Sequence, residues 1–170
     1  YIMDRIFRIK LNYFNYPIDN DGLIDSFSEN AKAMWVGKTE QRLNHEFYNV
    51  MEAYQVADLY QMADNVYIHT SPIQGMHGDL HFANILYNQQ TDQFKLLDPR
   101  GEYGKWHGTM GDNIYDWAKL AHDCYYGYNA IVADVPQNKI VKDIFVRKLK
   151  EYNLPEDIIL KGGLLLLATC

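Results

Sequence analysis

A chain of 170 residues that is 48% hydrophobic and 22% charged has the length and composition of one folded domain rather than of a disordered segment. Its formal net charge of -6 and pI near 5.4 argue against a nucleic-acid partner, because phosphate binding relies on clustered lysine and arginine. The longest apolar run, "LLLLA" at 164–168, is far shorter than the roughly 20 residues of a membrane span, so we expect no membrane partner.

The first part of the chain predicts one long helix after an uncertain start. Residues 1–38 are aromatic and mixed, with a turn expected in "NYPIDNDG" at 15–22. From Thr39 to Met62 apolar residues recur at intervals of three and four, which predicts an amphipathic helix with one buried face. The next stretch, "NVYIHTSPIQG" at 65–75, indicates a short extended segment and a loop, since proline and glycine interrupt it.

The last part of the chain predicts an irregular loop followed by three helices. The loop is "GEYGKWHGTMGDN" at 101–113, which holds four glycines. Asp112 or Asn113 can cap the first helix, the second is expected over Lys139–Tyr152, and Pro155 marks the start of the third. The class expected is therefore α+β, mostly helical, with one pair of short strands.

Two features of the whole chain bear on its context. Two cysteines cannot form a disulfide framework and no signal peptide is visible, which favours a reducing, cytoplasmic location. The chain opens on Tyr1 without a methionine and closes on the leucine-rich "KGGLLLLATC". We interpret it as a piece of a longer polypeptide that continues at both ends.

The segment "GMHGDLHFANILYNQQTDQFKLLDPRG" at 75–101 carries the chemistry. "ILYN" and "FKLLD" are short and apolar, and the polar "QQTD" between them predicts a hairpin. A turn centred on Thr91 pairs positions that sum to 182, which sets Asn84 opposite Asp98. Opposed residues have Cβ atoms about 4.5 to 5.5 Å apart, so an amide oxygen and a carboxylate would converge. Such a pair suits magnesium if a nucleotide supplies phosphate oxygens.

Asp79 lies five residues before Asn84, in the loop that leads into the first strand. A carboxylate there can reach the same space without binding the metal. It can then accept the proton of an attacking hydroxyl, or orient that hydroxyl in line with a phosphoryl group. The spacing therefore predicts phosphoryl transfer.

"HGDLHFANIL" followed by "LLDPRG" resembles the catalytic loop and metal-binding segment of the aminoglycoside phosphotransferase and choline kinase family, within the protein-kinase-like fold. The resemblance implies that Asp79 is the catalytic base and that Asn84 and Asp98 bind magnesium. It also implies that Leu86 forms an apolar floor under the adenine of ATP. Downstream, "GDNIYDWAKL" is similar to the family's helix start, which implies that Asp116 braces the catalytic loop.

Three further residues of the motif have open interpretations. We interpret His77 as a packed residue that shapes the loop, whereas His81 is equally a structural or a substrate-contacting residue. Arg100, in "DPRG", either meets an anionic substrate or pairs with a nearby carboxylate. This "DPRG" form most resembles kinase-like proteins found with bacterial capsule and surface-sugar pathways. The acidic net charge hints instead at a cationic acceptor.

The resemblance covers 76–120 and implies that residues 1–170 are the helical C-terminal lobe of a kinase-like domain. The N-terminal lobe, with its phosphate-covering loop and phosphate-binding lysine, has no counterpart before Thr39. The function expected is ATP- and magnesium-dependent transfer to a hydroxyl of a small molecule: a sugar, amino sugar or amino alcohol. The segment alone is expected to be inactive.

Two other classes of function remain open from the sequence. The first is a kinase-like module that has lost turnover and binds a nucleotide or a partner. The second is a calcineurin-like metallophosphatase, because "GDLH" at 78–81 resembles the first metal motif of that family. That family needs later asparagine-histidine and paired-histidine blocks, which do not occur in this sequence.

Overall fold

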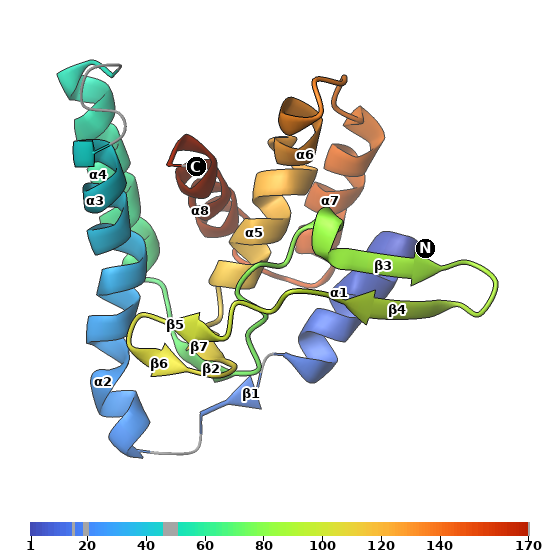
Figure 1. Cartoon of the computed structure of the whole chain (residues 1–170), viewed down its shortest axis with the longest axis horizontal. Coiled ribbons are helices and arrows are strands. Elements are labelled where there is room, and N and C mark those ends of the chain that lie inside the picture. Colours follow the sequence, from blue (N-terminus) through green and yellow to red (C-terminus); the bar gives the residue numbers. More distant parts are fainter. Residues whose placement is uncertain (15, 19–20, 46–50, 170) are drawn as a thin grey trace.

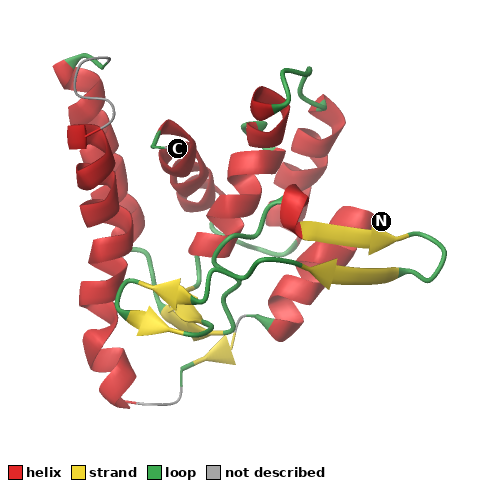
Figure 2. Cartoon of the chain, in the orientation of Figure 1, coloured by secondary structure: helices red, strands yellow, loops and turns green. Residues whose placement is uncertain are grey.

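The computed structural model describes residues 1–14, 16–18, 21–45 and 51–169. Within these residues the structure is α+β, about 59% helical with small antiparallel sheets, which confirms the mostly helical class (Figure 2). None of the described helices combines the length and the apolar content needed to cross a membrane.

The helices form a rod on one side and a packed group around a central pair. Figure 1 shows the rod, in which α2, η1 and α3 follow one another beside α4, while α5 and α8 lie at the centre. In chain order the helical elements are α1 (Ile2–Tyr13), α2 (Asp21–Lys32), the π-helical η1 (Ala33–Gly37), α3 (Lys38–His45), α4 (Ala53–Tyr67), the 3-10 turn η2 (Phe82–Asn84), α5 (Tyr115–Cys124), α6 (Tyr128–Val132), α7 (Lys139–Glu151) and α8 (Glu156–Ala168).

The strands form three small sheets in the described part of the chain. β3 and β4 make a hairpin that projects from the helices, whereas the other strands gather at the base of the molecule (Figure 1). The sheet orders are β1-β2-β7, β3-β4 and β5-β6, from β1 (Tyr16–Pro17), β2 (Pro72–Gln74), β3 (Ile85–Asn88), β4 (Gln93–Leu96), β5 (Glu102–Tyr103), β6 (Trp106–His107) and β7 (Met110–Asp112).

The single helix expected over Thr39–Met62 is wrong. Helix α3 ends at His45, α4 begins at Ala53, and residues 46–50 lie outside the described residues. Glu52 takes an extended conformation and forms a capping box with Gln55, which starts a new helix there. Helix α4 then runs on to Tyr67, through the first residues of the stretch expected to be extended, and only β2 confirms that expectation.

The loop expected at 101–113 contains short strands instead of being irregular throughout. Tyr103 pairs with Trp106, and both side chains are buried, so the hairpin β5–β6 serves to place two aromatic rings in the core. Strand β7 pairs with β2. Part of the turn expected at 15–22 lies outside the described residues, and its described part holds β1 and the start of α2.

Of the four described helices after residue 113, α5, α7 and α8 confirm their predictions, whereas the short α6 was not expected. Helix α7 covers Lys139–Glu151, and α8 starts at Glu156 directly after Pro155. At the start of α5 the Asp112 carboxylate accepts the backbone N–H groups of Ile114 and Tyr115, at 2.6 and 2.7 Å. Asp112 therefore satisfies two of the donors that a helix start leaves open. Burial raises the pKa of this carboxyl, and these hydrogen bonds offset part of the effect.

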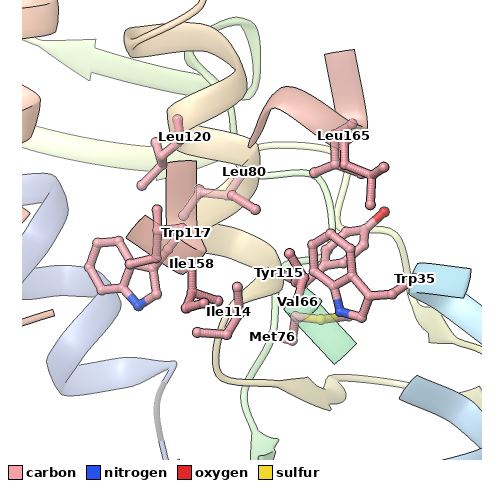
Figure 3. Close-up of a cluster of buried hydrophobic side chains, with 14 of the residues drawn as sticks. Trp35, Val66, Met76, Leu80, Ile114, Tyr115, Trp117, Leu120, Ile158 and Leu165 are labelled. Carbon is pink, nitrogen blue, oxygen red and sulfur yellow. The ribbon is translucent and has the colours of Figure 1, made fainter. Parts of the chain in front are cut away.

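The core lies between the central helices and joins the first helix to the last ones. Figure 3 shows Trp35, Tyr115 and Met76 in one part of it and Trp117 in another. The Phe7 ring of α1 lies 4.8 Å from Trp117 and 5.7 Å from Phe145, measured between ring centroids. Burial of each such side chain stabilises the fold by roughly 1.5 to 3 kcal/mol. The opening residues, whose role the sequence did not define, are therefore part of the core.

Two glycines allow α8 to lie close to α5. A Cβ atom at Gly162 would lie 2.9 Å from the Cβ of Ala118. A Cβ atom at Gly163 would lie 2.8 Å from the Cβ of Ala121 and 2.9 Å from the backbone N of His122. Backbone cannot yield as a flexible side chain can, so Gly163 fixes the separation of the two helices.

We predict that Gly163→Ala lowers the free energy of unfolding by about 1 to 3 kcal/mol, because the added methyl overpacks the α5–α8 contact. Denaturant unfolding measures this change. The matched control is Gly37→Ala in η1, where an added Cβ meets only the carbonyl O of Lys32 at an ordinary 3.9 Å. Because alanine has a higher helix propensity than glycine, the substitution at this position should be neutral or stabilise the fold by up to about 1 kcal/mol. Equal effects at both positions would contradict the close-packing argument.

Candidate functional site

The hairpin that was expected to carry the metal ligands exists, but its register is displaced by one residue. Paired positions sum to 181, as in Ile85 opposite Leu96, rather than to 182. The Leu97 N–H donates to the Asn84 carbonyl at 2.9 Å, so Leu97 and not Asp98 lies across from Asn84. The direct pairing of Asn84 with Asp98 was therefore wrong, and Asp98 is the next residue along the chain.

The displaced register follows from the turn. Its four residues, 89–92, have no central residue, whereas the expected pairing required a turn centred on Thr91. The Asn88 side chain accepts the N–H groups of Gln90 and Thr91 at 2.9 and 3.2 Å, and Asp92 takes a left-handed φ of 52°. Asparagine and aspartate suit such positions because their short side chains hydrogen-bond locally and tolerate positive φ.

Asn84 lies at the end of η2 and contacts Asp79. Its Nδ2 donates to the Asp79 carbonyl at 2.9 Å and to Asp79 Oδ2 at 3.2 Å. It also lies 3.3 Å from His81 Nε2. The amide nitrogen is thus fully engaged with the loop at 79–81. The other end of the amide, Oδ1, accepts no hydrogen bond from the residues that the structure describes, so a hard cation could use it.

Asp98 is exposed and takes a left-handed φ of 54° directly after β4. Positive φ is uncommon for a residue other than glycine and often marks a functional position. Within the described chain its carboxylate forms no hydrogen bond or ion pair. It is therefore free to bind a cation.

Asp79 is one-third exposed and is held by a residue that the sequence analysis missed. Lys119 Nζ lies 2.9 Å from Asp79 Oδ1, and His81 Nε2 lies 3.5 Å from Oδ2. Burial raises the pKa of the Asp79 carboxyl, but Lys119, His81 and Asn84 outweigh burial and bring the pKa below its ordinary value. Asp79 is accordingly a carboxylate that can orient a hydroxyl and accept its hydrogen bond.

Asp116 fixes the backbone of the loop. Its two oxygens accept the N–H groups of His77 and Gly78 at 2.9 and 2.8 Å, and Lys10 Nζ lies 2.9 Å from Oδ2. The side chains of Lys10 and Asp116 are both fully buried. The resemblance implied the role of Asp116, whereas nothing in the sequence indicated that its counter-ion comes from α1.

His77 and Gly78 complete the bend that precedes Asp79. The Asp79 N–H donates to His77 Nδ1 at 3.3 Å, which fits the loop-shaping role expected of this buried histidine. Gly78 has a φ of +82°, and a Cβ there would lie 2.6 Å from the Cβ of Arg100. Arg100 in turn donates its backbone N–H to the His77 carbonyl at 2.8 Å. Glycine is therefore required where the loop meets Arg100.

A second carboxylate of α5 holds the far end of the same loop. Asp123 Oδ2 accepts the N–H of Phe82 at 2.8 Å and the Asn129 amide at 2.7 Å. Asp116, Lys119 and Asp123 are three, four and seven positions apart, so they share one face of α5. The sequence analysis missed Lys119 and Asp123, although their spacing in a predicted helix was the signal that could have found them.

Leu86 and His81 lie in different surroundings. Leu86 is 51% exposed on β3 and lines a hollow of about 720 Å³ with residues of α1 and β4, among them Ile9 and Lys95. His81 is largely buried and lies edge-on to Tyr128, with ring centroids 6.1 Å apart. Leu86 is thus accessible to a flat apolar ligand, whereas His81 lies close to Asp79.

Arg100 contacts both a carboxylate and a phenol. Its guanidinium lies 3.7 Å from Glu102 and donates to the Tyr115 hydroxyl at 3.3 Å. The pairing with a carboxylate that the sequence left open is therefore present, although Glu102 is exposed and the separation is long. Burial, with repulsion from Arg100, Arg42 and Lys119, lowers the pKa of nearby Lys38 to about 8.

Comparison of the chain with protein-family models, with curated proteins and with solved structures returned no match. Among the described residues no group of three or more His, Cys, Asp or Glu side chains is arranged to hold a metal ion. Asn84 and Asp98 are therefore the candidate cation ligands that the geometry leaves open, and they need oxygen ligands from another molecule.

We predict that Lys10→Met lowers the free energy of unfolding by about 3 to 5 kcal/mol, because it leaves the buried Asp116 charge without its partner. Guanidinium unfolding measures the loss. In a double-mutant cycle, Asp116→Asn in the Lys10→Met background should be less damaging than in the wild type. The control is Lys161→Met, whose exposed i,i+4 pair with Asp157 should be worth less than about 1 kcal/mol. If the losses in the free energy of unfolding caused by the two single substitutions simply add in the double variant, the proposed coupling is contradicted.

We predict that Arg100→Gln raises the pKa of Lys38 above its value of about 8, because one repelling charge is removed. NMR titration of ¹³C-methylated lysines measures this pKa, and Arg147→Gln on α7 is the control that should leave it unchanged. The lowered pKa also has a stability consequence. Because the folded state favours neutral Lys38, this lysine adds to the free energy of unfolding at high pH. The added stability is fully present above its ordinary pKa of 10.5 and is lost as the pH falls through about 8. A Lys38 pKa of 10.5 in the folded wild type would contradict the argument.

Proposed function

We propose that the chain is the helical lobe of an ATP- and magnesium-dependent phosphotransferase that acts on a hydroxyl of a small molecule. One observation carries the proposal: Asn84 binds Asp79 through its amide nitrogen and leaves Oδ1 open, and Asp98, whose carboxylate is free, directly follows Leu97, the residue that hydrogen-bonds to the Asn84 carbonyl. An amide oxygen and a carboxylate beside an orienting aspartate are the groups that phosphoryl transfer uses. The reaction belongs in the cytoplasm, where ATP is present.

The residues fit a magnesium ion that is shared with a nucleotide. Asn84 Oδ1 and the Asp98 carboxylate would hold the ion, and phosphate oxygens and water would fill the remaining positions, because magnesium needs only one or two protein carboxylates in such sites. The bound ion would neutralise charge on the phosphates. Leu86 is exposed on the same hairpin and would lie under the adenine ring.

Asp79 would position the acceptor hydroxyl and take its hydrogen bond. Lys119 Nζ lies 2.9 Å from Asp79 Oδ1. The other oxygen, Oδ2, lies 3.2 Å from Asn84 Nδ2 and 3.5 Å from His81 Nε2. Since the Asp79 pKa lies below its ordinary value, orientation of the nucleophile contributes more than full proton abstraction. Asp116 and Lys10 would keep the loop in place during transfer.

The acceptor class proposed is a sugar, amino sugar or amino alcohol. The "DPRG" form of the metal segment supports it through its resemblance to capsule- and surface-sugar-associated kinases. A lobe that supplies nucleotide-phosphate contacts would be contributed by the rest of the polypeptide. The second candidate is a module that binds a nucleotide or a partner without turnover, and the ion pair of Lys119 with Asp79 favours it, because the aspartate is already occupied.

We predict that ATP binds in a magnesium-dependent manner and that Asp98→Ala abolishes this dependence. Calorimetric titration of ATP into the full-length protein, with and without magnesium, measures it. The matched control is Asp134→Ala, another exposed aspartate with positive φ, which should leave binding unchanged. No ATP binding under any condition would exclude the nucleotide site and favour partner binding.

We predict that Asp79→Asn spares ATP binding and lowers transfer at least about 100-fold, because the neutral amide lacks the charge with which the carboxylate orients the acceptor hydroxyl. ADP release with a panel of hydroxyl acceptors measures the transfer. Turnover at the wild-type rate in Asp79→Asn would show that another group acts as the base. Retained binding with no turnover in the wild-type protein itself would favour the non-catalytic module.

A further inference from the structure

Four cationic side chains come from three parts of the chain around Tyr115, and one of them, Lys119, contacts Asp79. They are Lys38 and Arg42 of α3, Arg100 after β4, and Lys119 of α5, which we call the cationic cluster. The sequence indicated only Arg100 as a contact for an anionic substrate, because the other three residues are scattered along an acidic chain. The nucleotide and metal residues of the proposed function do not include them, apart from the contact of Lys119 with Asp79.

Tyr115 joins the three parts of the cluster. Its ring lies 5.3 Å from that of Trp35, and its hydroxyl accepts from Arg100 at 3.3 Å. One turn further along α5 is Lys119, which contacts Asp79. Trp35 is followed at positions three and seven by Lys38 and Arg42, so its contact with Tyr115 brings the helical segment that carries these two cations against α5.

Electrostatic interactions agree with this geometry. Burial lowers the pKa of Lys38, and repulsion from Arg100, Arg42 and Lys119 lowers it further. The pKa of Tyr115 is raised to about 12 by burial, while Arg100 and Arg42 act in the opposite direction. Lys38 and Tyr115 therefore both lie within the electrostatic field of Arg100 and Arg42.

Positive charge in the cluster exceeds its negative charge. Asp79 pairs with Lys119, and the exposed Glu102 lies 3.7 Å from Arg100, whereas Arg42 donates to the uncharged Thr169 at 3.2 Å. The Nε of Arg100 is buried and has no hydrogen-bond partner among the described residues. Holding like charges together is unfavourable unless an anion neutralises them.

We propose that the cationic cluster binds an oxyanion carried by the acceptor, a phosphate or a carboxylate, so that the substrate is an anionic hydroxyl compound such as an acidic sugar. This inference rests on the proposed function, because it names the substrate class of that site. Arginine guanidinium matches the oxygens of both groups, and lysine adds charge. The oxyanion would hold the acceptor so that its hydroxyl reaches Asp79. The local charge is thus opposite to the cationic acceptor that the net charge of the chain suggests.

Acceptor binding without nucleotide tests the inference separately from the proposed function. We would titrate glucose 6-phosphate, glucuronate, glucose and glucosamine into the full-length protein by calorimetry at low ionic strength. The two acidic sugars should bind at least about tenfold more tightly than the two others, because a hydrogen-bonded charge contributes about this factor. The stronger of the two would identify phosphate or carboxylate. Equal binding of all four sugars, or binding of none, would overturn the inference.

Two variants and a matched control place the anion in the cluster. Arg100→Gln and Lys38→Gln should each weaken the acidic sugar about tenfold, whereas Arg147→Gln, an exposed arginine of α7, should not. Circular dichroism confirms that each variant is folded. Wild-type affinity in both folded cluster variants would overturn the inference.

A parallel titration with magnesium and ATP separates the two proposals. ATP affinity that is unchanged in Arg100→Gln and Lys38→Gln assigns the cluster to the acceptor, as proposed. An equal loss of ATP and acidic-sugar affinity would assign it to the nucleotide phosphates and overturn the inference. ATP binding without acidic-sugar binding leaves the phosphotransferase proposal intact, whereas acidic-sugar binding without ATP binding refutes that proposal alone.

Discussion

A carboxylate buried away from water is stable only with a counter-charge and enough donors, and Asp116 obtains them from two other segments of the chain. Lys10 supplies the charge, and the backbone N–H groups of His77 and Gly78 supply the donors. The requirement works in both directions, because the loop N–H groups also need an acceptor. Helix α1, the loop before Asp79 and helix α5 are thus held in one arrangement by a single side chain.

Helix α5 explains why the site and the core cannot be separated. It is buried on nearly all sides, yet it carries charged and polar groups along the face toward the loop, including Asp116 and Asp123. Its opposite contacts are set by the glycines of α8. Because the helix is fixed on its apolar side, its polar side can hold the loop backbone at both ends with little freedom.

Local patterns in the sequence predicted the hairpin, helices α5, α7 and α8, and a cap at Asp112 or Asn113, since each depends on residues a few positions apart. The hairpin register failed by one residue, because the Asn88 side chain closes a four-residue turn that periodicity does not report. The continuous helix through 39–62 failed because the Glu52 cap overrides its apolar pattern. Lys10, Lys38 and Arg42 could not be assigned, because only the packing of distant segments brings them to the site.

The two ends of α1 should respond differently to ionic strength. At one end Lys10 is paired with Asp116 where neither side chain contacts solvent. At the other end, Arg5 and Asp92 form an ion pair that holds the tip of the hairpin, and their side chains are 40% and 41% exposed. Salt screens exposed pairs strongly and buried pairs weakly. Rising salt would therefore weaken the contact between the tip of the β3–β4 hairpin and α1, whereas the buried pair that anchors the loop before Asp79 would be little affected.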